Sequence, residues 1–124
     1  MDIPGNLKYT KTHEWVKIDG SIAKVGITDF AQHEITDIVH IELPEIGKQV
    51  KKGQPVAIIE SVKSAFDIYT PVSGKIVGTN DSILESPENV NESPYEGGYL
   101  FVVEFDDEKE VESLLGAGDY KKLI

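Results

Sequence analysis

An internal repeat constrains the fold of this chain more than any other feature of its sequence. When the sequence is compared with itself at a shift of 27 residues, six positions carry the same or a similar residue: Pro44/Pro71, Gly47/Gly74, Lys48/Lys75, Val50/Val77, Gly53/Asn80 and Val56/Ile83. Glycine and asparagine both tolerate the left-handed backbone of a turn, so the Gly53/Asn80 match has a physical basis. The repeat predicts two similar β units, about 41–56 and 68–83, joined by a linker at 57–67.

The linker carries a lysine at its centre. Two duplicated sheets joined by one hairpin would place Lys63 at an exposed tip near the pseudo-symmetry axis, between Val62 and Ser64. An exposed turn lysine is common and often has no function. A modification site needs the same geometry, because a ligase must close around an ammonium that stands clear of the body. Acylation then replaces the charge with an amide and attaches an arm.

Local patterns around the repeat predict further strands and a short helix. Residues 15–18 and 22–25 flank Asp19-Gly20, a dipeptide typical of hairpin turns. Thr28 can cap a short helix over 29–35. The other expected strands are 38–43, 56–61, 66–70 and 99–105.

A helix is predicted near the C-terminus, over about 107–116. Asp107 and Glu110 have the spacing of a capping-box variant. The apolar residues Val111, Leu114 and Leu115 fall on one face of such a helix. A chain of 124 residues fits one domain, 1–124, with a β-sandwich core at about 20–105. The expected fold class is therefore mostly β, with a short internal helix and a C-terminal helix.

Composition excludes several classes of function. The net charge of −10 argues against nucleic acid and anionic membranes as partners, and no apolar run is long enough to span a membrane. The charge favours solubility, or steering toward a partner with a basic face. The chain has no cysteine, hence no thiol nucleophile, which is consistent with a reducing compartment. His13, His33 and His40 have no metal-binding spacing, and His40 is expected to fill a sheet face. Neither a catalytic constellation nor a metal site is predicted.

The tip segment Glu60-Ser61-Val62-Lys63 resembles the lipoylation motif of the glycine cleavage H protein. The resemblance continues along nearly the whole chain, in an ordered series of segments: 9–15, 25–29, 31–32, 37–39, 42–44, 71–74, 90–95 and 113–115. It implies a flattened β-sandwich of the lipoyl/biotinyl type, the barrel-sandwich hybrid. It also implies covalent lipoate, as N6-lipoyllysine at Lys63, flanked by Glu60, Ser61, Val62 and Ser64.

In function, the resemblance implies a carrier without catalytic activity. Such a carrier moves the aminomethyl group of glycine between a pyridoxal-phosphate glycine decarboxylase and a folate-dependent aminomethyltransferase. A dihydrolipoyl dehydrogenase reoxidises the arm, and a lipoyl ligase or transferase attaches it. We expect a monomer, located in a bacterial cytoplasm or, for a processed mature form, in an organelle matrix.

The family also has a surface cleft that receives the loaded arm. The matching residues are Thr12, Glu14 and Asp67. A protonated aminomethyl nitrogen is a cation, so the two carboxylates can pair with it and the hydroxyl can accept a hydrogen bond. Three positions depart from the usual pattern: Thr36 replaces a turn glycine, Phe66 replaces a small residue, and Tyr99 replaces tryptophan. These departures affect partner choice and the shape of the cleft.

Four other functions use similar features. A lipoyl relay protein, which donates its lipoyl group to other lipoate-dependent enzymes, would have the same sequence features. A biotin carrier usually reads Met-Lys-Met, whereas this chain reads Val62-Lys63-Ser64. A lipoyl domain of a 2-oxoacid dehydrogenase usually carries Asp-Lys-Ala and linkers to further domains. An unmodified interaction domain would not need the intact tip motif.

Overall fold

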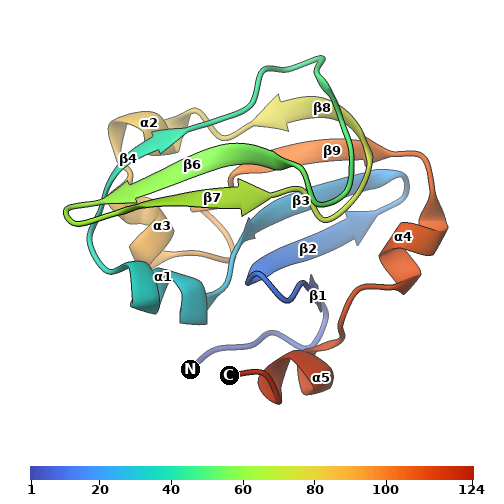
Figure 1. Cartoon of the computed structure of the whole chain (residues 1–124), viewed down its shortest axis with the longest axis horizontal. Helices are drawn as coiled ribbons and strands as arrows, with labels where there is room; N and C mark the ends of the chain where they lie inside the picture. The colour runs from blue at the N-terminus through green and yellow to red at the C-terminus, as the bar shows by residue number, and fades with distance from the viewer.

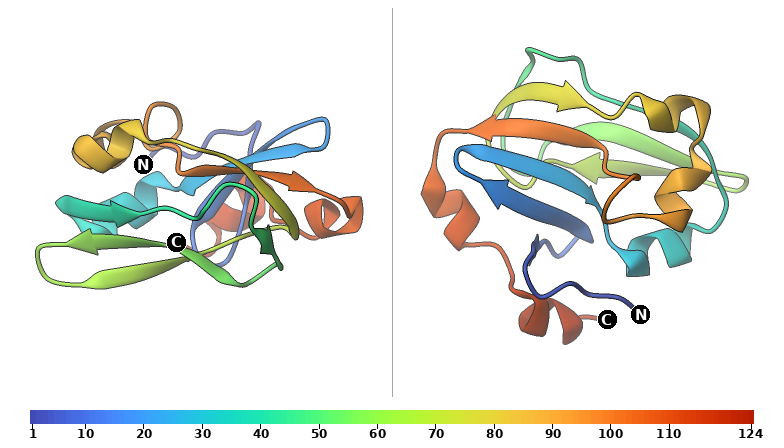
Figure 2. Two further views of the ribbon diagram at one scale, coloured as in Figure 1. Left: turned by 90° about the horizontal axis from the view of Figure 1, so that it is seen from above. Right: turned by 180° about the vertical axis from the view of Figure 1, so that it is seen from behind.

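Two antiparallel sheets form the body of the protein (Figure 1). A computed structural model describes residues 1–124. The larger sheet has the strand order β1 (Lys8–Tyr9), β2 (Glu14–Asp19), β3 (Ile22–Ile27), β9 (Phe101–Phe105), β8 (Gly74–Thr79) and β5 (Gln49–Val50). The smaller sheet has the order β4 (Ile38–Glu42), β6 (Pro55–Ser61) and β7 (Ala65–Tyr69). Seen from above, β6 and β7 lie on one side of the molecule and β8 and β9 on the other (Figure 2).

The predicted repeat is present in the backbone. The shift of 27 residues carries β4, residues 38–42, onto β7, residues 65–69, and carries β5 onto residues within β8. The correspondence ends before residue 80. Asn80 is not left-handed as Gly53 is; its buried side chain donates to the carbonyls of Gly97 and Tyr99. Ile83, the partner of Val56, lies in a helix, so the second β unit is shorter than predicted.

The core lies between the sheets and follows the alternation of the strands. Ile59 of β6 and Ile68 of β7 are buried, and so are Ile76 of β8 and Val103 of β9. They belong to one cluster of 20 buried hydrophobic residues. A smaller cluster of Leu7, Tyr9, Trp15 and Tyr120 lies beside it. Because side chains on a strand alternate, the residues between the buried ones face outward.

The predicted hairpin and internal helix are confirmed. Gly20 has a φ of +62° and lies in the turn between the paired residues Asp19 and Ile22. Helix α1 spans Asp29–Ile35, and the Thr28 hydroxyl accepts a hydrogen bond from the Ala31 amide. The helix ends at Thr36, whose φ is +67°. This threonine therefore adopts the left-handed conformation that a glycine would adopt more readily.

The C-terminal helix was predicted wrongly as one element. The segment forms α4 (Glu108–Glu112) and α5 (Ala117–Lys121), separated by a backbone bridge between Leu115 and Tyr9. Asp107 caps α4 by accepting from the Lys109 amide, but Glu110 does not complete a capping box. Its carboxylate accepts from the Ser73 amide and hydroxyl instead, which ties α4 to the sheet.

Other boundaries also differ from the prediction. The sandwich begins at β1 near Lys8 rather than at residue 20. Two short helices, α2 (Ser82–Glu85) and α3 (Glu88–Glu92), occupy a stretch in which no helix was predicted. Val111 and Leu114 pack against the main core, whereas Leu115 packs against the smaller cluster, so they do not share one face.

The close approach of β8 and β9 gives a test of the sheet. A Cβ atom on Gly74 would lie 2.0 Å from the carbonyl oxygen of Glu104. Gly74→Ala should lower the free energy of unfolding by at least about 2 kcal/mol, because the clash is with backbone fixed by strand pairing. Denaturant unfolding measures this loss. Gly118→Ala is the control, since nothing lies within 4 Å of the added atom. Equal stability of both variants would mean that the strands do not approach this closely.

Candidate functional site

The β6–β7 hairpin carries Lys63 at its tip and projects from one end of the molecule (Figure 1). Ser61 organises the turn. Its amide donates to the Ser64 carbonyl at 2.8 Å, and its hydroxyl oxygen accepts from the amides of Lys63 and Ser64 at 3.3 and 3.2 Å. The turn is therefore held by Ser61, while the side chains of Val62, Lys63 and Ser64 point into solvent.

The Lys63 ammonium has no partner. It makes no hydrogen bond, and the single salt bridge of the chain joins Lys122 and Asp119. Val62, beside it, is 76% exposed. Glu60, the first residue of the predicted motif, lies on β6. It is half-buried, and its side chain is on the outward face of the sheet. The structure thus places Val62, Lys63 and Ser64 at one exposed hairpin tip, with Glu60 and Ser61 at its base.

Glu14 lies in a different environment, at the start of β2. Its side chain is buried, with 1% of its surface exposed. One carboxylate oxygen accepts from the hydroxyls of Thr10 and Thr12, and the other accepts from the Tyr69 amide at 3.4 Å. Burial raises the pKa of Glu14, and these hydrogen bonds oppose the rise without cancelling it. The side-chain hydrogen bonds of this carboxylate therefore come from neutral donors, and it forms no salt bridge.

A pocket of about 270 Å³ opens over this carboxylate. Its walls are the turn between β1 and β2, the Gly53 turn, the end of β7 and the segment 113–115. Thr12 and Glu14, two of the three residues that the family resemblance assigns to the arm cleft, both line it. Tyr9, Leu114 and Leu115 contribute an apolar side. Lys11 and Lys52 also line the pocket. The apolar side and the Glu14 carboxylate together suit a short chain with an apolar stem and a cationic end.

Asp67 does not line this pocket. It pairs with Ile58 across β6 and β7, faces outward, and lines a separate groove beside residues 42–48. Tyr69 is two residues further along β7 and lines the pocket with Glu14. Asp67 and Tyr69 are two residues apart, so their side chains lie on the same side of β7, opposite buried Ile68. Along that side, Asp67 lies between the hairpin tip and the pocket.

Thr10 was not predicted as a site residue, yet it contacts Glu14 more extensively than Thr12 does. Its hydroxyl donates to the Glu14 carboxylate and accepts from the Glu14 amide at 3.0 Å. The Thr10 amide also donates to the Glu14 carbonyl. A hydroxyl residue four positions before a carboxylate in a non-helical turn is the signal that could have identified it.

Helix α5 holds the turn that presents Glu14. His13 has a φ of +72°, and its Nδ1 lies 2.8 Å from the Tyr120 hydroxyl. The same hydroxyl lies 2.7 Å from the Thr28 hydroxyl, and the Thr28 amide donates to the His13 carbonyl. Tyr120 also stacks on Tyr9, with ring centroids 4.8 Å apart. A residue far along the chain therefore fixes the backbone beside Glu14.

A two-sheet sandwich that presents one unpaired lysine at the tip of its hairpin is a carrier domain of the lipoyl/biotinyl type. The chain belongs to the glycine cleavage H-protein family, whose model matches residues 7–124. H proteins are the non-catalytic lipoyl carriers of the glycine cleavage system, and this family carries a covalently attached lipoyl-lysine. The chain is thus a component of that system.

Individual relatives agree along the whole length. A glycine cleavage system H protein of Endomicrobium trichonymphae is 73% identical over 124 residues, covering all of both chains. One from Carboxydothermus hydrogenoformans is 49% identical and covers 98% of this chain and 94% of its own. The crystal structure of an H protein from Mycobacterium marinum has a TM-score of 0.85 at 33% identity, covering 97% of each chain. These relatives are bacterial.

Two positions that depart from the family pattern, Phe66 and Tyr99, have different surroundings. Phe66, 37% exposed, pairs with Ile59 close to the hairpin tip. Tyr99 packs under the Lys24 ammonium, which lies 4.6 Å from the centroid of its ring.

No helix of the chain has the length and apolar character needed to cross a membrane.

The buried carboxylate predicts a pH dependence of stability. Because the folded state raises the pKa of Glu14, it binds that proton more tightly than the unfolded state does. The contribution of Glu14 to stability is therefore greatest below the unfolded pKa. This contribution falls as pH rises from the unfolded pKa of Glu14 to its folded pKa. Above the folded pKa, the full free-energy cost of burying the charged carboxylate applies. Glu14→Gln should remove this fall, so its stability relative to wild type should rise across the interval.

Denaturant unfolding at a series of pH values measures this difference. Glu112→Gln is the matched control, because Glu112 is exposed at the end of α4 and its side chain stays in solvent in both states. Parallel stability curves for wild type and Glu14→Gln would show that the Glu14 carboxylate is solvated in the folded protein.

Proposed function

We propose that Lys63 is the lipoyl attachment residue of this carrier. Lys63 fits the group, because its ammonium is unpaired and the neighbouring Val62 and Ser64 are exposed and small enough for a ligase to enclose the tip. Ser61 holds the turn rigid from within. Glu60, on the outward side of β6, adds a negative charge at the base of the tip. Attached there, the lipoyl disulfide supplies the redox and group-carrying chemistry.

The observation that carries the proposal for the loaded arm is the Glu14 carboxylate, which is buried among neutral donors and forms no salt bridge. A protonated aminomethyl end of the arm supplies the missing charge. Glu14 pairs with it, Thr10 and Thr12 orient the carboxylate, and the apolar side formed by Leu114 and Leu115 covers the stem. The pocket excludes bulk water from the amine, which slows hydrolysis of the labile S–CH2–NH2 group.

Asp67 has a different place in this proposal. Because it lies on the outward side of β7 between the tip and Tyr69, it flanks the route of the arm rather than its end point. A solvent-exposed carboxylate attracts a cation only weakly. Asp67 therefore guides the loaded arm toward the pocket, and Glu14 holds it there.

The partners follow from this cycle. We assign a pyridoxal-phosphate glycine decarboxylase to loading, a folate-dependent aminomethyltransferase to unloading and a dihydrolipoyl dehydrogenase to reoxidation. A lipoyl ligase or transferase modifies Lys63.

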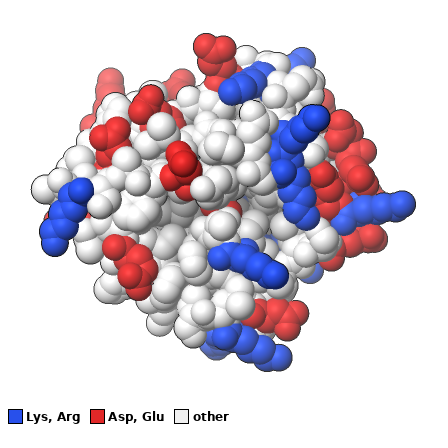
Figure 3. Space-filling model, in the orientation of Figure 1, with Lys and Arg blue, Asp and Glu red and all other residues white.

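Acidic side chains are spread over the face that carries β6 and β7, with lysines among them (Figure 3). With a net charge of −10, this surface steers the carrier toward partners with basic docking faces. We place the chain, as a monomer, in a bacterial cytoplasm, which the bacterial origin of its relatives supports.

Lys63→Arg tests the attachment site. The variant should fold as wild type does, because an exposed turn charge contributes little to stability. It should accept no lipoyl group, since a guanidinium is not acylated by a ligase that forms a lysine amide. Intact-mass analysis after incubation with lipoate, ATP and a lipoyl ligase gives the result.

Lys48→Arg is the control, because Lys48 is also an exposed turn lysine and stands in the first unit of the repeat. It should gain the full mass of one lipoyl group. A lipoyl mass on Lys63→Arg would place the attachment elsewhere and overturn the assignment.

Glu14→Gln tests the pocket. Loss of one partner from a charge-assisted hydrogen bond costs about 1.5–3 kcal/mol, so the loaded arm should leave the pocket roughly tenfold more often. Spontaneous release of the aminomethyl group from the loaded protein should accelerate accordingly. Lipoylation and reoxidation should stay near wild-type rates, because neither step needs the bound cation.

Asp67→Asn tests whether Asp67 only guides the loaded arm toward the pocket, while Glu14 holds it there. Its release rate should stay much closer to wild type than that of Glu14→Gln, because Asp67 lies outside the pocket. If Glu14→Gln released no faster than wild type, Glu14 would have no part in holding the arm.

A further inference from the structure

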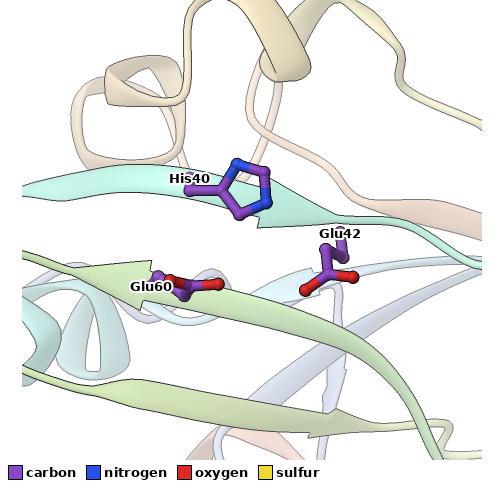
Figure 4. A group of neighbouring side chains, drawn as sticks. All are labelled: His40, Glu42 and Glu60. Atoms are coloured by element: carbon purple, nitrogen blue, oxygen red, sulfur yellow. The ribbon is translucent and has the colours of Figure 1, made fainter.

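Three side chains converge on the outward face of the smaller sheet, beside the base of the β6–β7 hairpin and apart from the Glu14 pocket. Figure 4 shows His40 and Glu42 of β4 and Glu60 of β6 turned toward one another. One ligand atom from each, an imidazole nitrogen or a carboxylate oxygen, can be chosen so that all three lie within 4.8 Å of one another. The spacing of histidines along the chain gave no metal pattern, because these ligands come from two strands.

The sheet holds the three residues in place. His40 and Glu60 are direct partners across β4 and β6. His40 and Glu42 are two residues apart and so share a side of β4, while Ile41 and Ile59 between them are buried in the core. The three Cα positions are therefore set by core packing, and the side chains need only rotamer changes to meet a common ligand.

None of the three side chains has a partner within the protein. The side chains of His40, Glu42 and Glu60 form no hydrogen bond, and the one salt bridge of the chain joins Lys122 and Asp119. Two carboxylates at this separation repel each other when charged. The imidazole distinguishes the group from an ordinary acidic patch, because it adds a nitrogen ligand to the two carboxylates.

We propose that His40, Glu42 and Glu60 bind a divalent transition-metal cation, with Zn²⁺ the best match. One nitrogen and two oxygen donors suit zinc, which takes three protein ligands and keeps a fourth position for water in open sites. Ligand atoms around tetrahedral zinc lie about 3.3 Å apart, so small movements of exposed side chains complete the site. Mg²⁺ and Ca²⁺ favour sets of oxygen ligands and should bind weakly. The proposal does not depend on the lipoyl assignment.

Isothermal titration of the full chain with Zn²⁺ tests the site. The protein is used without a polyhistidine tag and without its lipoyl group, because dithiols bind zinc themselves. We expect one saturable site per chain, at least tenfold weaker in His40→Ala and in Glu60→Gln. Excess Mg²⁺ should not displace the zinc.

His33→Ala is the matched control, because His33 is equally exposed but lies on α1 and belongs to no such group. It should bind zinc as wild type does. Thermal unfolding checks that the His40→Ala and Glu60→Gln variants remain folded. Absence of saturable binding, unchanged affinity in His40→Ala, or equal loss in His33→Ala would overturn the proposal.

Discussion

Burial of one side of the β6–β7 hairpin against the larger sheet determines where Lys63 lies. Ile59 and Ile68 face the core, and a slip of one residue in either strand would turn them outward and expose the apolar face. The register of the hairpin is therefore strongly fixed. Its tip inherits that rigidity, because Ser61 closes the turn with its own amide and hydroxyl. A lipoyl arm attached at Lys63, as we propose, would therefore extend from a fixed position on the sheet.

The second constraint is the cost of burying Glu14. Desolvation disfavours its charged form, and three neutral donors offset only part of that cost. Such a carboxylate gains most from a ligand that brings a positive charge into the pocket. On the proposed function, this unfavourable burial makes the pocket prefer the cationic loaded arm to the neutral oxidised arm. Tyr120 and the His13 turn maintain the geometry at a distance from the pocket.

Much of this could be predicted from the sequence, because the relevant signals are local. The repeat located the hairpin and its lysine, and the Thr28 cap located α1. Features that depend on contacts between distant segments were missed. Helices α2, α3 and α5 are too short to show a helical period, and α4 ends earlier than predicted. Pairing between strands places Asp67 away from Glu14 and places His40 opposite Glu60. The spacing of residues along the chain does not specify which strands pair.

The central claim is that one flexible arm on Lys63 moves between solvent and the Glu14 pocket according to its charge. Backbone amide NMR of the lipoylated protein, oxidised and then loaded by glycine and the decarboxylase, tests it most directly. Loading should shift the resonances of Thr10 to Glu14, Tyr69 and Ser113 to Leu115, whereas the oxidised arm should leave them as in the unmodified protein. Shifts confined to the residues of the hairpin tip in both states would contradict the account.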